Sequence, residues 1–341
     1  MNSLHLQEKQ SRFGYLLFLF CISGLLLAAG LLWSVKFGQA QVSWSAVFDA
    51  LTYREHDKVH LYIQTLRLPR TLTACLVGIA LALAGLLTQL ATKNPLASPH
   101  IFGINAGASL AVVAGLVFAS GLSLIGTMLL AFAGGTAGAL LVWSLSSGSG
   151  PGQHVRLALA GITIHFLLSS LTEGFIILNQ YSTESMIFWL VGSVNQAGWP
   201  EVRMLLPFFI GGVAMLGLML PSFRLLLMDD EIAAGLGQRV TIVRGAALLL
   251  VILLAGASVA VCGPIGFICL IVPHIARALV GQHLPVLVPL TGLLGGVLLV
   301  YADLFSRMVA FPFESPVGIV TSAIGAPFFI YLARRNRRNR A

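Results

Sequence analysis

The chain has 341 residues, of which 57% are apolar and 9% are charged, and its mean hydropathy is +0.91. Soluble domains average about 25% charged residues, so this composition excludes a protein whose surface is mostly exposed to water. The net charge of +8 does not indicate nucleic acid binding, because the arginines lie between apolar runs and form no basic stripe. A helix of about 20 apolar residues crosses a bilayer, and the length therefore allows on the order of ten crossings.

The predicted membrane helices begin with the apolar run from Tyr15 to Trp33, which follows Lys9 and Arg12. This run is longer than a signal-peptide core of about 7–15 residues, so we expect it to be retained, with its N-terminus in the cytoplasm. The charge-poor runs after it are Thr71–Leu90, Ile101–Ser120, Leu122–Ser144, Leu157–Leu178, Met204–Leu220, Ala246–Val272, Pro285–Leu304 and Pro316–Ala333. A tight turn is predicted at Gly121, which separates two of these runs.

The run from Ala246 to Val272 decides the number of crossings, because it is long for one span and is interrupted at Gly263 and Pro264. Counted once it gives nine spans, and counted as two helices it gives ten. Ten spans place thirteen of the twenty Lys and Arg residues on the cytoplasmic side, where positive charge accumulates. We therefore predict an all-α polytopic membrane protein with about ten transmembrane helices and both termini in the cytoplasm. We expect one domain over residues 1–341, with a membrane core at 15–333, a cytoplasmic loop at 221–245 and a basic tail at 334–341.

No pattern in the sequence indicates an enzyme or a metal site. The cysteines lie inside apolar runs without metal-ligand spacing, so we interpret them as packing residues and predict no bound metal. None of the four lysines stands in a G-x-x-x-x-G-K-[ST] loop, and neither H-E-x-x-H nor G-x-S-x-G occurs. ATP hydrolysis that drives this chain must therefore occur on another polypeptide.

Three groups of motifs indicate the function of the chain more specifically than its composition does. Small residues such as Gly78 and Gly85 let membrane helices approach closely, and the breaks at Asn94-Pro95 and Gly263-Pro264 are tolerated only where protein or water covers the backbone. The motifs are Leu66–Arg70, Gly78–Gly85, Gln89, Asn94–Pro99 and Gly103–Gly107, then Gly263–Phe267 and Val272–Arg277, then Ala302–Asp303, Arg307, Glu314–Gly318 and Gly325–Pro327. In order and spacing they closely resemble the permeases of the FecCD family of ABC importers, from about Leu66 to the C-terminus.

The resemblance implies a type II ABC importer permease fold in the bacterial inner membrane. It implies a permease subunit that translocates an iron chelate, a ferric siderophore or ferric citrate, from a periplasmic binding protein to the cytoplasm. The implied partners are a second permease subunit, two ATPase subunits that hold ATP and Mg, and the binding protein. This chain itself is expected to bind no cofactor. Cobalamin and haem remain alternative substrates within the family, and the second permease is either the same chain or a homologue.

The resemblance also assigns candidate contact residues on both sides of the membrane. Arg67, Arg70 and Arg307 lie at predicted outer helix ends, where interfacial snorkelling would also explain them. In similar permeases, arginines at these positions accept acidic residues of the binding protein, and a guanidinium suits bidentate carboxylate binding. We expect local ion pairs of Asp303 and Glu314 near Arg307. The residues expected to contact the ATPase are Asp229, Asp230, Ala233, Gly235, Gly237, Gln238 and Arg239.

Polar residues inside the spans are candidates for the translocation pathway, namely Gln89, His165 and Glu173. His165 and Glu173 are about 80° apart around one predicted helix, and ionisable groups within a membrane are functional candidates. Glu173 lies near the outer end, where it can also reach water. The candidates for helix breaks and gating are Asn94, Pro95, Gly263, Pro264 and Pro273. A proton-coupled secondary transporter remains the rival hypothesis, with Glu173 as its one candidate carboxylate near the bilayer midplane.

Overall fold

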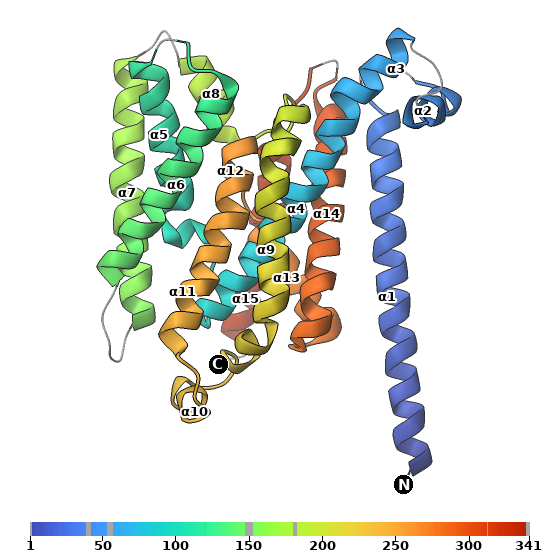
Figure 1. Cartoon of the computed structure of the whole chain (residues 1–341), viewed down its shortest axis with the longest axis vertical. Helices are drawn as coiled ribbons and strands as arrows, with labels where there is room; N and C mark the ends of the chain where they lie inside the picture. The colour runs from blue at the N-terminus through green and yellow to red at the C-terminus, as the bar shows by residue number, and fades with distance from the viewer. Residues whose placement is uncertain are drawn as a thin grey trace.

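The computed structural model describes residues 2–38, 42–52, 57–119, 121–146, 153–179, 183–311 and 313–338, which form helices and contain no strand. Figure 1 shows the helices as an elongated bundle in which α1 begins and α15 ends near the same end as α10. Residues 147–152, between the predicted runs Leu122–Ser144 and Leu157–Leu178, lie outside the described residues.

Among the described residues, seven helical segments are long and apolar enough to cross a membrane, and three further apolar helices are shorter. The long segments are α1 (Asn2–Lys36), α3–η1–α4 (Lys58–Tyr62, Ile63–Arg67, Leu68–Thr92), α6 (Leu124–Ser146), α7 (Gln153–Leu178), α9 (Trp199–Leu225), α11–η4–α12 (Val240–Val251, Ile252–Gly256, Ala257–Cys262) and α14 (Leu284–Val309). The shorter ones are α5 (Ile104–Phe118), α13 (Ile268–Val280) and α15 (Val317–Arg338). Short helices connect them: α2 (Trp44–Leu51), η2 (Pro99–Phe102), α8 (Thr183–Val191) and α10 (Asp230–Gly235).

The split at Gly263 and Pro264 confirms the count of ten. Helix α12 ends at Cys262 and α13 begins at Ile268, so this motif separates two helices and does not kink one. Gly263 has φ +69°, and a Cβ there would lie 2.3 Å from the carbonyl oxygen of Trp189. Only glycine therefore fits at this break.

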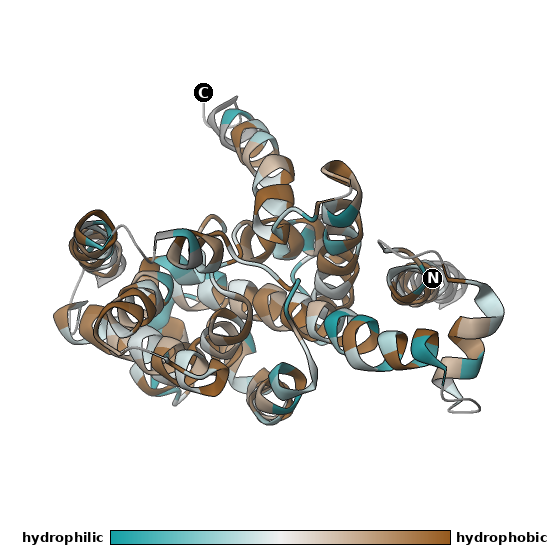
Figure 2. Ribbon diagram, turned by 90° about the horizontal axis from the view of Figure 1, so that it is seen from above, coloured by the Kyte–Doolittle hydropathy of each residue, from teal (hydrophilic) through white to brown (hydrophobic). Residues whose placement is uncertain are grey.

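Helix α4 is the buried centre of the bundle and packs against α9, α11, α13 and α14. Its span is 78% buried, whereas α1 at the edge is 17% buried. Figure 2 shows α1 and α15 at the periphery when the bundle is seen from above. The close packing of α4 depends on glycine, because a Cβ at Gly78 would lie 2.3 Å from the carbonyl oxygen of Gly295.

Several boundaries differ from the sequence-based prediction. The second span begins at Lys58 and not at Thr71, because the π-helix η1 leads directly into α4. Its wide turn brings the Leu68 amide to the carbonyl of Ile63, just before Pro69, which has no amide to donate. The polar loop is shorter than 221–245, since α9 extends to Leu225 and α11 begins at Val240. The predicted tail after residue 333 continues α15 as far as Arg338.

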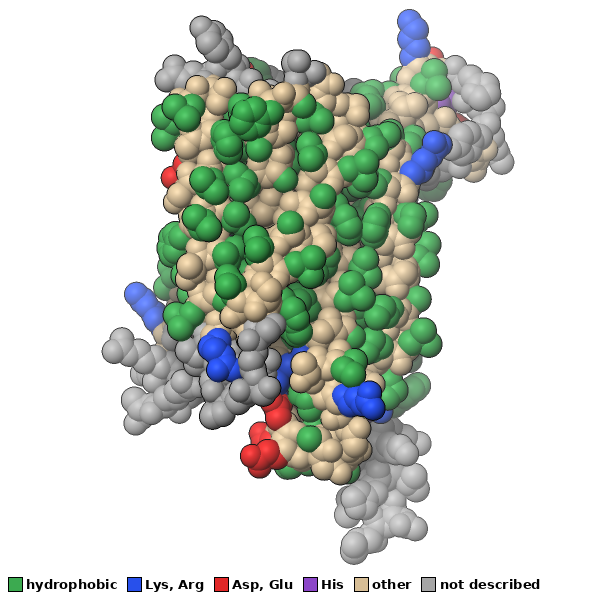
Figure 3. All heavy atoms as spheres, turned by 60° about the vertical axis from the view of Figure 1, so that its left-hand side comes forward, with side chains coloured by type: hydrophobic (Ala, Val, Ile, Leu, Met, Phe, Trp, Pro, Cys, Tyr) green, Lys and Arg blue, Asp and Glu red, His purple; other side chains and the backbone are tan. Residues whose placement is uncertain are grey.

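Side chains on the outside of the bundle are those of a membrane protein. Figure 3 shows hydrophobic side chains along the height of one face, with the Lys, Arg, Asp and Glu side chains of that face near its ends. Exposed apolar residues such as Leu218 (83%) and Phe166 (66%) would be costly in water. The chain is a multi-pass membrane protein.

Candidate functional sites at the two ends of the bundle

The end of the bundle opposite α10 holds a buried charge cluster, which we define as Arg70, Asn195, Asp303, Arg307 and Glu314. Arg70 donates to Asp303 Oδ1 from Nη2 at 2.8 Å, to Glu314 Oε2 from Nη1 at 2.5 Å and to Asn195 Oδ1 from Nη2 at 3.0 Å. Arg307 forms an ion pair with the second oxygen of the Asp303 carboxylate. The expected local pairing of Asp303 and Glu314 is confirmed, and Arg70 takes part in it as well as Arg307.

Arg67 and Arg307 also cap the C-terminal end of α1. Arg67 Nη1 donates to the carbonyls of Val35 at 3.0 Å and Lys36 at 2.6 Å. Arg307 Nη1 donates to the carbonyls of Ser34 at 2.8 Å and Phe37 at 3.1 Å. The last carbonyls of a helix have no intrahelical partner and carry its negative dipole end, so cations stabilise them.

The three arginines of the docking prediction therefore lie at one end of the bundle but point inward. Arg67, Arg70 and Arg307 are only 3%, 7% and 5% exposed. Their internal partners give each of them a structural role in joining α1, α4 and α14. Docking of a binding protein on these residues stays a prediction, and it requires at least one of the internal bonds to open.

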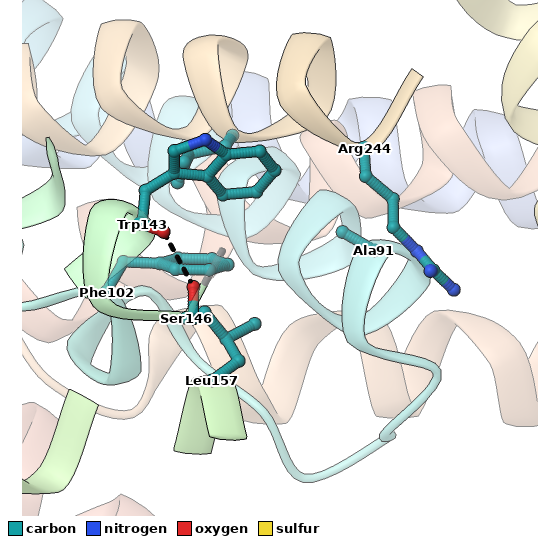
Figure 4. A pocket seen from close by; sticks show the side chains of 7 residues that line it. Ala91, Phe102, Trp143, Ser146, Leu157 and Arg244 are labelled. Atoms are coloured by element: carbon teal, nitrogen blue, oxygen red, sulfur yellow. Dashed lines mark hydrogen bonds between the residues drawn. The ribbon is translucent and has the colours of Figure 1, made fainter. Parts of the chain in front are cut away.

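At the other end, the segment between α9 and α11 is folded back onto the bundle through Asp230. Its carboxylate pairs with Lys93 Nζ at 2.8 Å and with Arg244 Nη2 at 3.0 Å, and Lys93 also donates to the Met228 carbonyl at 2.6 Å. Partial burial acts to raise the pKa of Asp230, but the hydrogen bond and charge of Lys93 and the charge of Arg244 outweigh it and lower that pKa. Figure 4 shows Arg244 extending from α11 past Ala91 of α4, next to a small pocket.

The predicted ATPase-contact residues divide into anchoring and exposed ones. Ala233 is buried, and Gln238 Nε2 donates to the Ser222 carbonyl at 2.6 Å. Gly237, with φ +85°, ends α10 in a left-handed turn that glycine adopts without strain. The residues that remain exposed are Asp229, Gly235 and Arg239, together with the apolar side chains of Ile232 and Leu236. The result is a short helix with an apolar, partly acidic outer face.

The structure does not bring the three candidate pathway residues together. Gln89 is buried in α4, where Nε2 donates to the Cys269 carbonyl at 3.3 Å and Oε1 accepts from Arg277 of α13. His165 and Glu173 lie exposed on α7, which packs on α5 and α6. A pathway role for each of them stays a prediction.

The candidate helix breaks also divide into two groups. Asn94 and Pro95 lie in the turn after α4, where Asn94 Oδ1 accepts from the Leu96 amide at 3.0 Å. Pro273, however, is inside α13 and does not interrupt it. Proline lacks the amide that would bond the Cys269 carbonyl, and Gln89 of α4 bonds that carbonyl instead. The prediction of a break at Pro273 was wrong because a side chain from another helix supplies the missing donor.

Sequence reasoning did not single out Asn195, Lys93 or Arg244 as site residues. Arg244 lies just before the predicted run Ala246–Val272, where a basic residue is an ordinary boundary feature of a membrane helix, and Asn195 lies in a loop, so neither gave a signal of a site. Within the described residues, no group of three or more His, Cys, Asp or Glu side chains could hold a metal ion.

Comparison with known proteins agrees with this architecture. The model of the FecCD transport family matches residues 26–335. The chain is 45% identical to the Fe(3+)-citrate import system permease protein YfmD of Bacillus subtilis, over 94% of this chain and 96% of that protein. It is 39% identical to the Fe(3+) dicitrate transport system permease protein FecD of Escherichia coli, over 92% and 97%. A solved inward-facing metal-chelate type ABC transporter superposes with a TM-score of 0.82 at 30% identity, covering 93% and 99% of the two chains. The buried bundle with its charge cluster at one end and its folded loop at the other thus has the ABC importer permease fold, and the chain belongs to the FecCD transport family.

Proposed function

We propose that this chain is the permease subunit of an ATP-driven importer that moves a ferric chelate from a periplasmic binding protein into the cytoplasm. The observation that carries the proposal is the near full-length similarity to YfmD, a ferric citrate import permease. Several other similar permeases carry names for ferric dicitrate, hydroxamate or siderophore transport. Ferric citrate is therefore the first substrate to test, and ferric siderophores are the second.

The inner end supports a separate ATPase partner. The outer face of α10 presents Ile232 and Leu236, 55% and 62% exposed, next to the carboxylates of Asp229 and Glu231. Apolar side chains surrounded by charge are typical of a protein interface. We place this face in the cytoplasm because the charge bias favours that side for both termini, and the membrane is then the bacterial inner membrane.

A second permease subunit is supported by the exposed polar groups of α7. His165 and Glu173 face outward from the single chain, and ionisable groups facing lipid are energetically costly. A second copy or a homologue would cover them or enclose them in a shared water-filled pathway. Transport would then follow from rigid-body movement of the two subunits when the ATPases close and open.

The outer end supports docking of the binding protein through Arg70. Its partner Glu314 lies outside the long helices and its side chain is 20% exposed, whereas Asp303 is fully buried. A carboxylate on the binding protein can therefore replace Glu314 without opening the Arg70–Asp303 pair. Charge-assisted hydrogen bonds of this kind are short and strong.

The test is transport by the complete importer in proteoliposomes, with the binding protein outside and ATP inside. We expect ATP-dependent uptake of labelled ferric citrate, with less or no uptake of a ferric siderophore or cobalamin. An ATPase variant lacking its phosphate-binding lysine is the control and must abolish uptake. Uptake that continues with this variant and follows a proton gradient would overturn the proposal in favour of a secondary transporter.

A further inference from the structure

A cavity of about 260 Å³ opens at the α10 end of the bundle and has no part in the contacts proposed above. Its polar lining residues are Gln89, Lys93, Arg277 and Gln282, and its apolar lining residues include Leu227 and Leu287. It lies between the ends of α4 and α13, the start of α14 and the segment after α9. A liquid water occupies about 30 Å³, so the cavity can hold a group much larger than one solvent molecule.

The cavity lining carries positive charge. Lys93 and Arg277 are the two ionised groups that line it, and Lys93 is paired with Asp230, which lies outside the lining. Among the described residues no carboxylate forms an ion pair with Arg277, whose side chain bonds the neutral amide of Gln89. A partly buried cation without a counter-charge is unfavourable, and an anion in the cavity would supply that charge.

The start of α14 adds to this preference. Helix α14 has 26 residues and begins at Leu284, and Leu287 of its first turn lines the cavity. Pro285 has no amide, and the amides of Val286 and Leu287 already donate to the His283 carbonyl, so α14 offers few free donors here. The N-terminus of the helix is still the positive end of its dipole and adds to the positive potential of Arg277.

The position of the cavity at the helix ends fits the depth of lipid head groups. Lys93 is the residue at which α4 ends, and Gln89 lies about one helical turn, roughly 6 Å, further into the bundle. Tyr15 of α1, which is 46% exposed, donates to the Leu279 carbonyl at 3.4 Å near the same end of α13. Exposed tyrosines of this kind are typical of the membrane interface.

We propose that this cavity binds the phosphate of an anionic phospholipid. The phosphate oxygens accept hydrogen bonds from Arg277, Lys93 and the Gln282 amide, and the glycerol and first methylenes contact Leu227 and Leu287. Basic pockets between membrane helices on the cytoplasmic side bind anionic head groups in this way. The Lys93 ammonium group has three donors, of which Asp230 and the Met228 carbonyl take two, so the third is left for the phosphate.

A soluble phosphate offers the same oxyanion chemistry. It makes no use of the leucines in the lining, however, and Leu227 is 43% exposed. These features favour a ligand with both a phosphate and an apolar part. Binding of a phospholipid and binding of inorganic phosphate, measured separately, distinguish the two ligands.

The experiment is a titration of the purified full-length importer in neutral detergent with short-chain phosphatidylglycerol, followed by intrinsic fluorescence or calorimetry. Short-chain phosphatidylcholine and inorganic phosphate are titrated in parallel. We expect saturable binding of phosphatidylglycerol and weaker binding of both others. Equal binding of phosphatidylcholine would overturn the phosphate assignment, and equal binding of inorganic phosphate would overturn the lipid assignment.

Variants of the cavity test its location. Gln282 is exposed at the rim, so Gln282→Glu adds a carboxylate without disturbing the core and should weaken phosphatidylglycerol binding by about tenfold or more. Arg277→Gln should weaken it similarly, and Arg277→Lys should retain most of it. The matched control is Arg224→Gln, which removes an exposed charge at the end of α9 outside the cavity lining. Wild-type affinity in both Gln282→Glu and Arg277→Gln would overturn the proposal.

Discussion

Arg70 of α4 donates hydrogen bonds to both oxygens of the Asp303 carboxylate on α14, at 2.8 to 3.2 Å, across 233 residues of sequence. Asp303 is fully buried, and its second oxygen also pairs with Arg307. One carboxylate therefore pairs with two buried guanidinium groups, and Glu314 supplies the second negative charge beside Arg70. Arg307 also bonds the end of α1. The Asp303 carboxylate thus connects α14 to α4 through Arg70 and to α1 through Arg307.

Replacing Asp303 should be strongly destabilising. In Asp303→Asn both guanidinium groups lose their shared counter-charge, and breaking a buried ion pair typically costs about 3–5 kcal/mol. We expect a clearly lower unfolding temperature in detergent, measured by scanning fluorimetry. The control is Glu184→Gln on α8, which removes an exposed carboxylate and should leave the unfolding temperature unchanged. An Asp303→Asn protein as stable as wild type would contradict the role of this carboxylate.

The contact between α4 and α13 should be equally sensitive to a single methyl group. A Cβ at Gly85 would stand 2.0 Å from the carbonyl oxygen of Cys269, so Gly85→Ala must push two backbones apart. Overpacking typically costs about 1–3 kcal/mol, and here no flexible side chain can move aside. Gly217→Ala in α9 meets nothing within 4 Å and serves as the control. Denaturation in detergent should show a lowered stability for Gly85→Ala but not for Gly217→Ala. Equal stability of the two variants would mean that α4 and α13 can move apart freely.

The membrane-spanning architecture was predictable because apolar length and charge bias act locally along the chain. The split at Gly263 followed from its proline neighbour and the excess length of that run. The short helices α2 and α8 were not expected, because eight or nine residues with mixed polarity give no membrane signal. The early start of the second span was missed because Leu66–Arg70 contains charge and proline, which the π-turn of η1 accommodates.

The types of residue at the two ends of the bundle were predictable from the sequence, but their geometry was not. Arginines at the outer helix ends and a polar inner loop were identified from the sequence. Their burial was not, since it depends on partners such as Asp303 and the α1 carbonyls, which are distant in sequence. The bond from Gln89 to the Cys269 carbonyl likewise depends on how α4 and α13 align. A sequence motif alone does not specify how two helices align in space.

Acid should release the α10 segment. The pKa of Asp230 is lowered in the folded protein, chiefly by Lys93 and Arg244 acting against partial burial. A lowered pKa means that the stabilisation is complete well above the unfolded value of about 3.9 and is lost as the pH falls through the folded pKa. A spin label at Gly235→Cys, where a side chain meets no neighbour within 4 Å, should become more mobile as the pH falls from the unfolded value of about 3.9 through the lower folded pKa. With Asp230→Asn added, the label should be mobile already at pH 7, whereas Glu231→Gln should behave as wild type. A label that stays immobile at pH 7 in the Asp230→Asn protein would show that the ion pairs do not hold this segment.

Glu314 should compete with the binding protein for Arg70. Glu314→Gln removes the more exposed of the two carboxylates on Arg70 and leaves the Asp303 pair intact. If an acidic residue of the binding protein docks on Arg70, the variant should bind it more tightly, because no internal charge has to be displaced. Partly exposed ion pairs contribute up to about 1 kcal/mol, so the gain should reach about fivefold at low salt and shrink as ionic strength rises. Affinity is measured in nanodiscs by biolayer interferometry with the purified binding protein, and Glu184→Gln, far from Arg70 in sequence and exposed on α8, controls for net charge. Weaker binding of Glu314→Gln would indicate that Glu314 itself contributes to the docking surface and that Arg70 serves only to hold it in place.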